Sequence, residues 1–107
     1  MLGVRESRRQ VASVLQRAVR RAADAWTVQE GLHSAYLLDF PCLLDSKVLP
    51  PTLRRQIDAL AADLGARLGF QRGGQKIGPS TLGRETAAAL LARLEAATAE
   101  AERLARA

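Results

Sequence analysis

The sequence predicts an all-α protein, a small three- to four-helix bundle with a long C-terminal helix. Apolar residues recur at steps of three and four in three separate segments, which is the period of an amphipathic helix. No segment alternates apolar and polar residues as a half-buried strand does. Helix-forming Ala and Leu dominate the composition, with 20 and 17 copies. A chain of 107 residues has room for a single domain, which we place at residues 1–107.

A basic amphipathic helix is expected within residues 1–27, at about residues 8–26. Ser7 and Gln10 have the spacing of a capping box at its start. Its apolar stripe steps by four, three, four and four through Val11, Leu15, Ala18, Ala22 and Trp26, which places Trp26 in the core. The opposite face carries Arg9, Arg17, Arg20 and Arg21. The whole net charge of +5 arises in the first 21 residues, so a basic element precedes a neutral body.

Residues 28–68 form the predicted helical body. Thr27 and Glu30 have the spacing of a second capping box, which predicts a helix at about residues 28–38. The same pattern also fits one long kinked helix continuing from the first, and both interpretations stay open. Gly31 is expected to weaken this helix by about 1 kcal/mol relative to Ala. Pro41 interrupts the segment 36–51, so the helix should stop by Asp39, which would cap a short turn through Leu44.

Two further helices are expected after the Pro50–Pro51 pair. One carries Leu53, Ile57, Leu60, Leu64 and Leu68 on a single face and ends at Gly69. A Gly-rich loop at residues 69–83 follows. The last helix, at residues 84–107, places Leu90, Leu94, Ala97, Ala101 and Leu104 at steps typical of a heptad repeat and thus of a coiled coil.

Composition excludes several functional classes. One Cys and one His cannot make a disulfide framework or a Cys/His zinc site. Cys42 and His33 lack a third orienting group, so no nucleophilic site is expected. No apolar run reaches the roughly 18 residues that span a bilayer. We therefore expect no enzyme activity, no cofactor, no metal and no membrane span, and an intracellular location, with nucleus or cytoplasm ahead of mitochondrion.

The leading functional expectation is a helical subunit or adaptor that packs Leu and Ala faces into a larger complex, most simply a hetero-complex. Methyl-sized Ala side chains bury little apolar area, so a partner would complete the core. The expected partner-binding residues are Tyr36, Leu37, Leu38, Phe40, Leu43 and Leu44 in the interrupted segment, and Leu90, Leu94 and Leu104 on the last helix. Asp39 and Asp45 would lie at the rim of the first patch.

Two alternatives use the basic N-terminal helix. In the first, an accessory nucleic-acid-binding protein contacts phosphates or an acidic partner, because the planar guanidinium binds both groups bidentately. The residues expected to make these contacts are Arg9, Arg17, Arg20, Arg21, Arg72 and Lys76. In the second, the Arg-rich helix is a mitochondrial import signal. The simplest interpretation of the same arginines is a solvated helix face.

Overall fold

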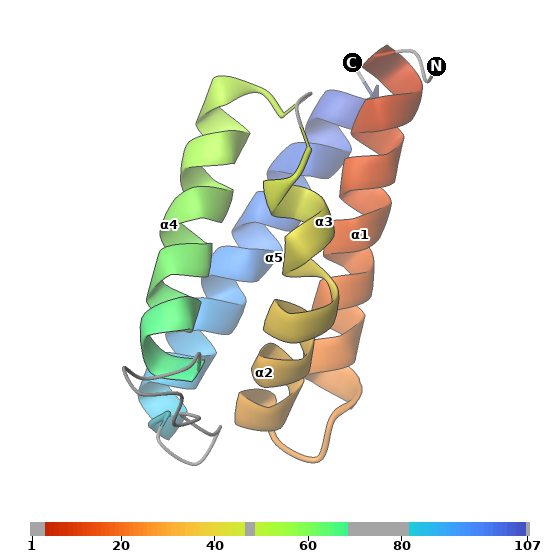
Figure 1. Ribbon diagram of the computed structural model, residues 1–107. Coiled ribbons are helices and arrows are strands. Elements are labelled where there is room, and N and C mark those ends of the chain that lie inside the picture. Colours follow the sequence, from red (N-terminus) through yellow and green to blue (C-terminus); the bar gives the residue numbers. More distant parts are fainter. Residues whose placement is uncertain (1–3, 47–48, 69–81, 107) are drawn as a thin grey trace.

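The computed structural model describes residues 4–46, 49–68 and 82–106, and every element within them is a helix. The elements are α1 (Val4–Asp24), α2 (Val28–Leu38), α3 (Phe40–Leu44), α4 (Pro51–Leu68) and α5 (Arg84–Arg106). They form four columns that run alternately down and up, with α2 and α3 sharing one column (Figure 1). The all-α class and the long C-terminal helix are therefore confirmed.

The hydrophobic core lies between the four columns. Each column contributes side chains that are fully buried, which include Leu15, Leu32, Phe40, Leu53, Ile57, Leu60, Leu64 and Leu94. Buried Ala residues of α1 and α5 belong to this core, and these two helices contact each other. Small side chains on facing helices shorten the distance between helix axes, which keeps a core rich in Ala closed. The described chain thus buries its own apolar stripes.

Helix α1 begins earlier and ends earlier than its sequence predicts. It starts at Val4, so Ser7 lies inside the helix, buried, and the predicted capping box is wrong. It ends at Asp24, two residues before Trp26. The helical register that would carry Trp26 into the core therefore stops short, and this side chain lies in the turn with 97% of its surface exposed. The prediction of a core Trp26 is wrong for this reason.

Helices α1 and α2 are separate, which decides between the two interpretations left open by the sequence. Thr27 caps α2, since its Oγ1 accepts a hydrogen bond from the Glu30 amide at 3.1 Å. Gly31 lies against the end of α1: a Cβ atom at this position would be 2.4 Å from the Cα of Ala22. Glycine at residue 31 therefore lets the two helices approach closely, a packing role that its low helix propensity did not indicate.

Pro41 divides the second column into α2 and α3, as predicted. The Asp39 amide still donates to the Ala35 carbonyl at 2.8 Å, but Pro41 has no N–H to continue the series. The Asp39 side chain makes no capping hydrogen bond to α3. It is completely buried, so the expectation that it caps the turn or rims an exposed patch is wrong.

The heptad stripe of α5 faces the other helices of the bundle and not the solvent. Leu90, Leu94, Ala97 and Ala101 are buried, and α5 contacts α1, α2 and α4. Leu104 is half-buried against the same core. The expectation that Leu90 and Leu94 contact a partner directly is therefore wrong for the folded chain, because the neighbouring helices already cover them. The heptad spacing of α5 reflects packing within one chain.

Candidate protein-interaction surface

The most distinctive polar feature of the molecule is a buried carboxylate held by two arginines of α1. Arg17 donates from Nε to Oδ1 of Asp39 at 2.8 Å. Arg21 donates from Nε to Oδ2 at 2.9 Å and from a terminal nitrogen to Oδ1 at 3.4 Å. Asp39 is fully buried, whereas the side chains of Arg17 and Arg21 are 52% and 35% exposed. The carboxylate thus lies beneath two guanidinium groups that still contact solvent.

The local sequence explains how this cluster forms. Arg17 and Arg21 are four residues apart, so they lie on one side of α1. Asp39 sits at the junction that Pro41 creates between α2 and α3, in the column next to α1. A buried carboxylate needs hydrogen-bonded countercharges, and the two guanidinium groups supply them. Two of the arginines predicted to contact phosphate or an acidic partner therefore already share one internal acid.

A groove of about 430 Å³ runs between α1 and α2 beside this cluster. We call it the arginine groove, and it is lined by Arg17, Arg20, Arg21, Asp24, Ala25, Ser34 and Leu38. Arg20 is exposed and forms no ion pair among the described residues. The groove combines a basic wall from α1 with a leucine from α2, so it offers both charge and apolar surface.

Three large apolar side chains of the same column are exposed. Leu37, Leu38 and Leu44, which we call the leucine ridge, are 45%, 57% and 42% exposed. Pro41 and Cys42 lie between them in the chain and are exposed as well. With Trp26, the leucine ridge makes up the exposed large hydrophobic residues of the described chain. Three of the predicted partner-binding residues therefore lie on the surface.

The other predicted contacts in this segment face inward. Phe40 and Leu43 are buried in the core, so the expectation that they anchor a partner is wrong for the folded chain. Tyr36 is half-buried, with its ring 6.2 Å from that of Phe40. Its hydroxyl would lie 2.8 Å from a Cβ atom at Gly65, so Tyr36 fills the space that this glycine leaves on α4. Helix periodicity separates these inward residues from the leucine ridge.

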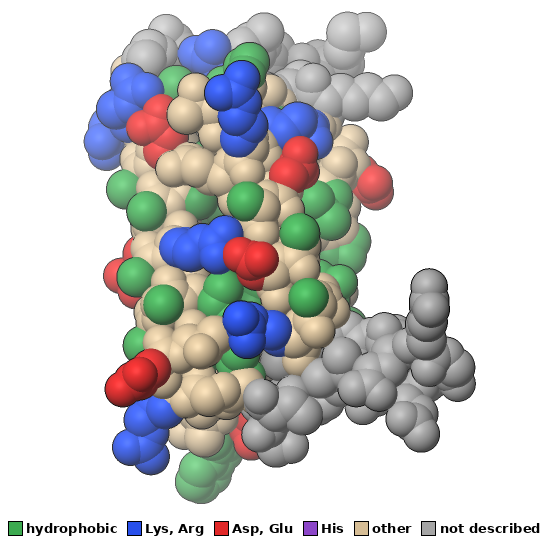
Figure 2. All heavy atoms as spheres, turned by 90° about the vertical axis from the view of Figure 1, so that its left-hand side faces the viewer, with side chains coloured by type: hydrophobic (Ala, Val, Ile, Leu, Met, Phe, Trp, Pro, Cys, Tyr) green, Lys and Arg blue, Asp and Glu red, His purple; other side chains and the backbone are tan. Residues whose placement is uncertain are grey.

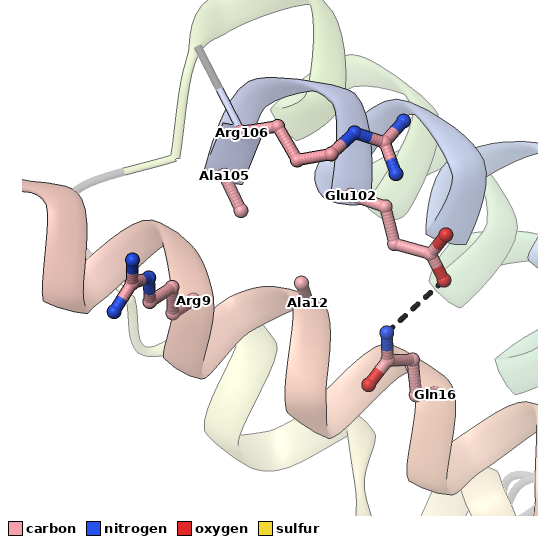
Figure 3. Close-up of a pocket in the computed structure, with 6 residues that line it drawn as sticks. All are labelled: Arg9, Ala12, Gln16, Glu102, Ala105 and Arg106. Carbon is pink, nitrogen blue, oxygen red and sulfur yellow. Dashed lines mark hydrogen bonds between the residues drawn. The ribbon is translucent and has the colours of Figure 1, made fainter.

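Arg9 lies apart from the arginine groove, on the side of α1 that faces α5. A hollow of about 560 Å³ lies there. Figure 3 shows Arg9 and Ala12 on α1 across this hollow from Ala105 and Arg106 on α5. Gln16 donates to Glu102 at 3.1 Å across one end of this hollow. The predicted arginine face is thus divided between two sides of α1. Arg72 and Lys76 lie outside the described residues.

The α4 side of the molecule has a different character. Figure 2 shows that basic and acidic side chains are interspersed over this face and that its hydrophobic side chains are scattered. Ion pairs contribute to this mixture: Arg93 with Asp63 between α5 and α4, and Arg54 with Asp58 within α4. Mixed, locally paired charge is typical of a solvated helix face. This face therefore provides control positions for experiments on the arginine groove.

The described residues contain neither of two other kinds of feature, a metal-binding cluster or a membrane-spanning helix. No three or more His, Cys, Asp or Glu side chains there are grouped so as to hold a metal ion. None of the helices in the described chain combines the length and apolar character needed to cross a membrane. Comparison with family models, curated proteins and solved structures found no match to this chain.

Proposed function

We propose that this protein is a non-enzymatic helical subunit that docks onto another protein through the leucine ridge and the arginine groove. One observation carries the proposal. The apolar stripes of the helices are closed within the core, yet Trp26 and the leucine ridge remain exposed beside α1. Binding energy concentrates in a few large apolar or Arg side chains, and this surface supplies both kinds.

The proposed function is still that of a helical subunit, but the docking face differs from the one that the sequence favours. The heptad stripe of α5 is covered by α1 and α4, so a partner contacts the α2–α3 column in its place. Tyr36 and Leu104, both half-buried, contribute at most their exposed edges. The interface is therefore small and mixed in character, as expected for a subunit that folds before it binds.

The test compares the size of the native assembly with and without the leucine ridge. The 107-residue chain is expressed with a tag in the source cells, and the nuclease-treated extract is fractionated by size. The wild type is expected to elute well above 11.5 kDa. The triple variant L37E, L38E and L44E is expected to elute as a monomer, whereas A59E and A62E, on the exposed face of α4, leave the complex intact. A monomeric wild type, or an intact complex in the triple variant, overturns the proposal.

A second candidate function is sequence-independent binding of nucleic acid by α1. Arg9 and Arg20 favour it, since both are exposed and neither forms an ion pair among the described residues. Replacing both by Ala should then lower the affinity for duplex DNA and reduce the salt slope by about 1.8, at roughly 0.9 per phosphate contact. An unchanged slope eliminates this candidate.

The third expectation was that α1 is a mitochondrial import signal. Val11, Leu15 and Ala18 of α1 are core residues, which argues against cleavage of this helix.

A further inference from the structure

We propose that the arginine groove binds an acidic amphipathic helix of the partner protein, with a partner carboxylate completing the Arg17–Asp39–Arg21 cluster. This inference rests on the proposed function and specifies the chemistry of the partner. It follows from the number of charges in the cluster, from their fixed positions and from the apolar residues at both ends of the groove.

The cluster carries an uncompensated positive charge. Two guanidinium groups share the single carboxylate of Asp39. Each guanidinium has five N–H donors, and Arg17 uses only its Nε for Asp39. Both side chains remain partly exposed at the groove, so free donors are accessible to a second acceptor. A carboxylate suits this position because it accepts two parallel hydrogen bonds from a guanidinium.

The buried carboxylate also holds the two arginines in place. A free arginine on a helix surface loses side-chain entropy when it binds, and this loss weakens most surface ion pairs. Arg17 and Arg21 have already lost much of that freedom, because each donates to an immobile, fully buried Asp39. The groove is therefore better prepared for an acidic ligand than an arginine face without an internal acid.

The ends of the groove set the pattern of the ligand. Leu38 is exposed at one end, and Ala25, which precedes the fully exposed Trp26, lies at the other. Asp24 lines the groove close to Ala25 and repels a carboxylate there, so the acidic residues of the ligand belong toward Arg17 and Arg20. From Arg17 to Asp24 the groove follows about 10 Å of α1, which matches two turns of a bound helix. A helix with acidic and apolar residues spaced three or four apart would place its acids on the arginines and its apolar side chains on the two ends of the groove.

The probe for this proposal is a displayed library of 15-residue amphipathic helices with randomised flanking charges. Selection is carried out on the wild-type chain of residues 1–107 and, in parallel, on the variants R20E and R55E. Arg55 is an exposed arginine of α4 without an ion pair among the described residues, so R55E matches the charge change at a distant place. The wild type and R55E are expected to enrich acidic peptides, and R20E is expected to lose at least tenfold in affinity for them.

Nuclear magnetic resonance then maps one enriched peptide on ¹⁵N-labelled protein. The Nε–H signals of Arg17 and Arg21 and the indole signal of Trp26 should shift, and Gln in place of the peptide's Glu should weaken binding at least tenfold. W26A, which changes a side chain outside the core, should also weaken binding without unfolding the protein. The expected result is a shift confined to the arginine groove and its two ends.

Each of the following results overturns the inference: enrichment of neutral or basic peptides, no enrichment over R20E, equal losses in R20E and R55E, or signal shifts beyond the groove and its two ends. Stronger shifts of the same arginine signals by a 20-base-pair DNA duplex than by the acidic peptide also overturn it, in favour of phosphate binding. The size of the native assembly distinguishes this failure from that of the proposed function. If the triple leucine variant loses its complex while peptide charge has no effect, the docking function stands and the acidic partner is rejected.

Discussion

Arg17 and Asp39 are 22 residues apart in the chain, yet the Arg17 Nε lies 2.8 Å from the Asp39 Oδ1. This contact ties the middle of α1 to the junction between α2 and α3. Arg21 reinforces it from the next turn of α1. From the sequence, Arg17 and Asp39 would be taken for solvated surface charges, but they form an ion pair that joins two columns of the bundle.

The internal acid is expected to contribute to stability through its charged hydrogen bonds. Asp39→Asn keeps the size of the side chain but removes its charge, so we expect a loss of about 1–3 kcal/mol in the free energy of unfolding. Urea denaturation followed by circular dichroism measures this loss. Arg55→Ala is the control and should change stability by less than about 0.5 kcal/mol. A loss for Asp39→Asn no larger than for the control contradicts the assigned role.

Removing both arginines while keeping Asp39 should be more damaging than removing the acid. The double variant R17A and R21A leaves a buried carboxylate without countercharge, which costs more than losing the whole cluster. Adding Asp39→Asn to the double variant should therefore restore part of the lost stability. Denaturation midpoints of the three proteins test this order. Simple additivity of the losses would mean that the carboxylate does not depend on the two arginines.

Gly31→Ala should destabilise the protein although alanine has the higher helix propensity. Its Cβ would lie 2.4 Å from backbone of α1 at Ala22, so the two helices must separate, at a cost of about 1–3 kcal/mol. Gly65→Ala is the matched comparison within a helix. There the close atom is the Tyr36 hydroxyl, at the far end of a half-buried side chain and not in a helix backbone, so the loss should be much smaller. Thermal unfolding of both variants tests the contrast, and equal losses contradict it.

Replacing a leucine of α5 should lower stability, whereas replacing a leucine of the leucine ridge should weaken binding. Leu94 is fully buried, so Leu94→Ala should cost about 2–5 kcal/mol. Leu38 is 57% exposed, so Leu38→Ala should cost less than about 1 kcal/mol while it weakens the native assembly. Unfolding curves and the elution size of the assembly provide the two measurements. If the Leu94→Ala variant is stable but loses its partner, α5 contacts the partner directly and the prediction is wrong.

Thr27 should contribute to stability as the cap of α2. Its Oγ1 accepts from the Glu30 amide, and losing a threonine cap typically costs about 1 kcal/mol. Thr52 is an exposed threonine in the first turn of α4, so Thr52→Ala is the control and should be neutral or slightly stabilising. Chemical denaturation of the two variants measures the difference. A neutral Thr27→Ala variant would mean that α2 begins independently of this hydrogen bond.

The exposed pair Glu100 and Arg103 on α5 predicts a weak dependence of stability on acid. The hydrogen bond from Arg103 lowers the pKa of Glu100, with a smaller attraction from its charge. A carboxyl with a lowered pKa stabilises the fold above its unfolded pKa, and this contribution disappears as the pH falls through the folded pKa. In an NMR titration, Arg103→Ala should raise the pKa of Glu100. Arg106→Ala, which removes an arginine that has no ion pair among the described residues, should leave this pKa unchanged.

Short-range patterns in the sequence were sufficient for much of the architecture. The steps of three and four among apolar residues predicted each long helix, and Pro41 predicted the break in the second column. Thr27 supported a separate α2 as one of two alternatives, between which the sequence did not decide. These features depend on hydrogen bonds and side-chain contacts within about four residues, so neighbouring residues determine them. Helix ends were less predictable: α1 begins before its apparent cap at Ser7.

Only the tertiary structure decided which side chains are covered. The partners of α5, the backbone beside Gly31 and the acid beneath Arg17 and Arg21 all come from segments distant in the sequence. A heptad stripe or an arginine face has the same local pattern whether it meets solvent, another protein or its own chain. The sequence by itself thus determined the helices and the charge of α1, and the packing of the columns decided which leucines and guanidinium groups remain available for binding.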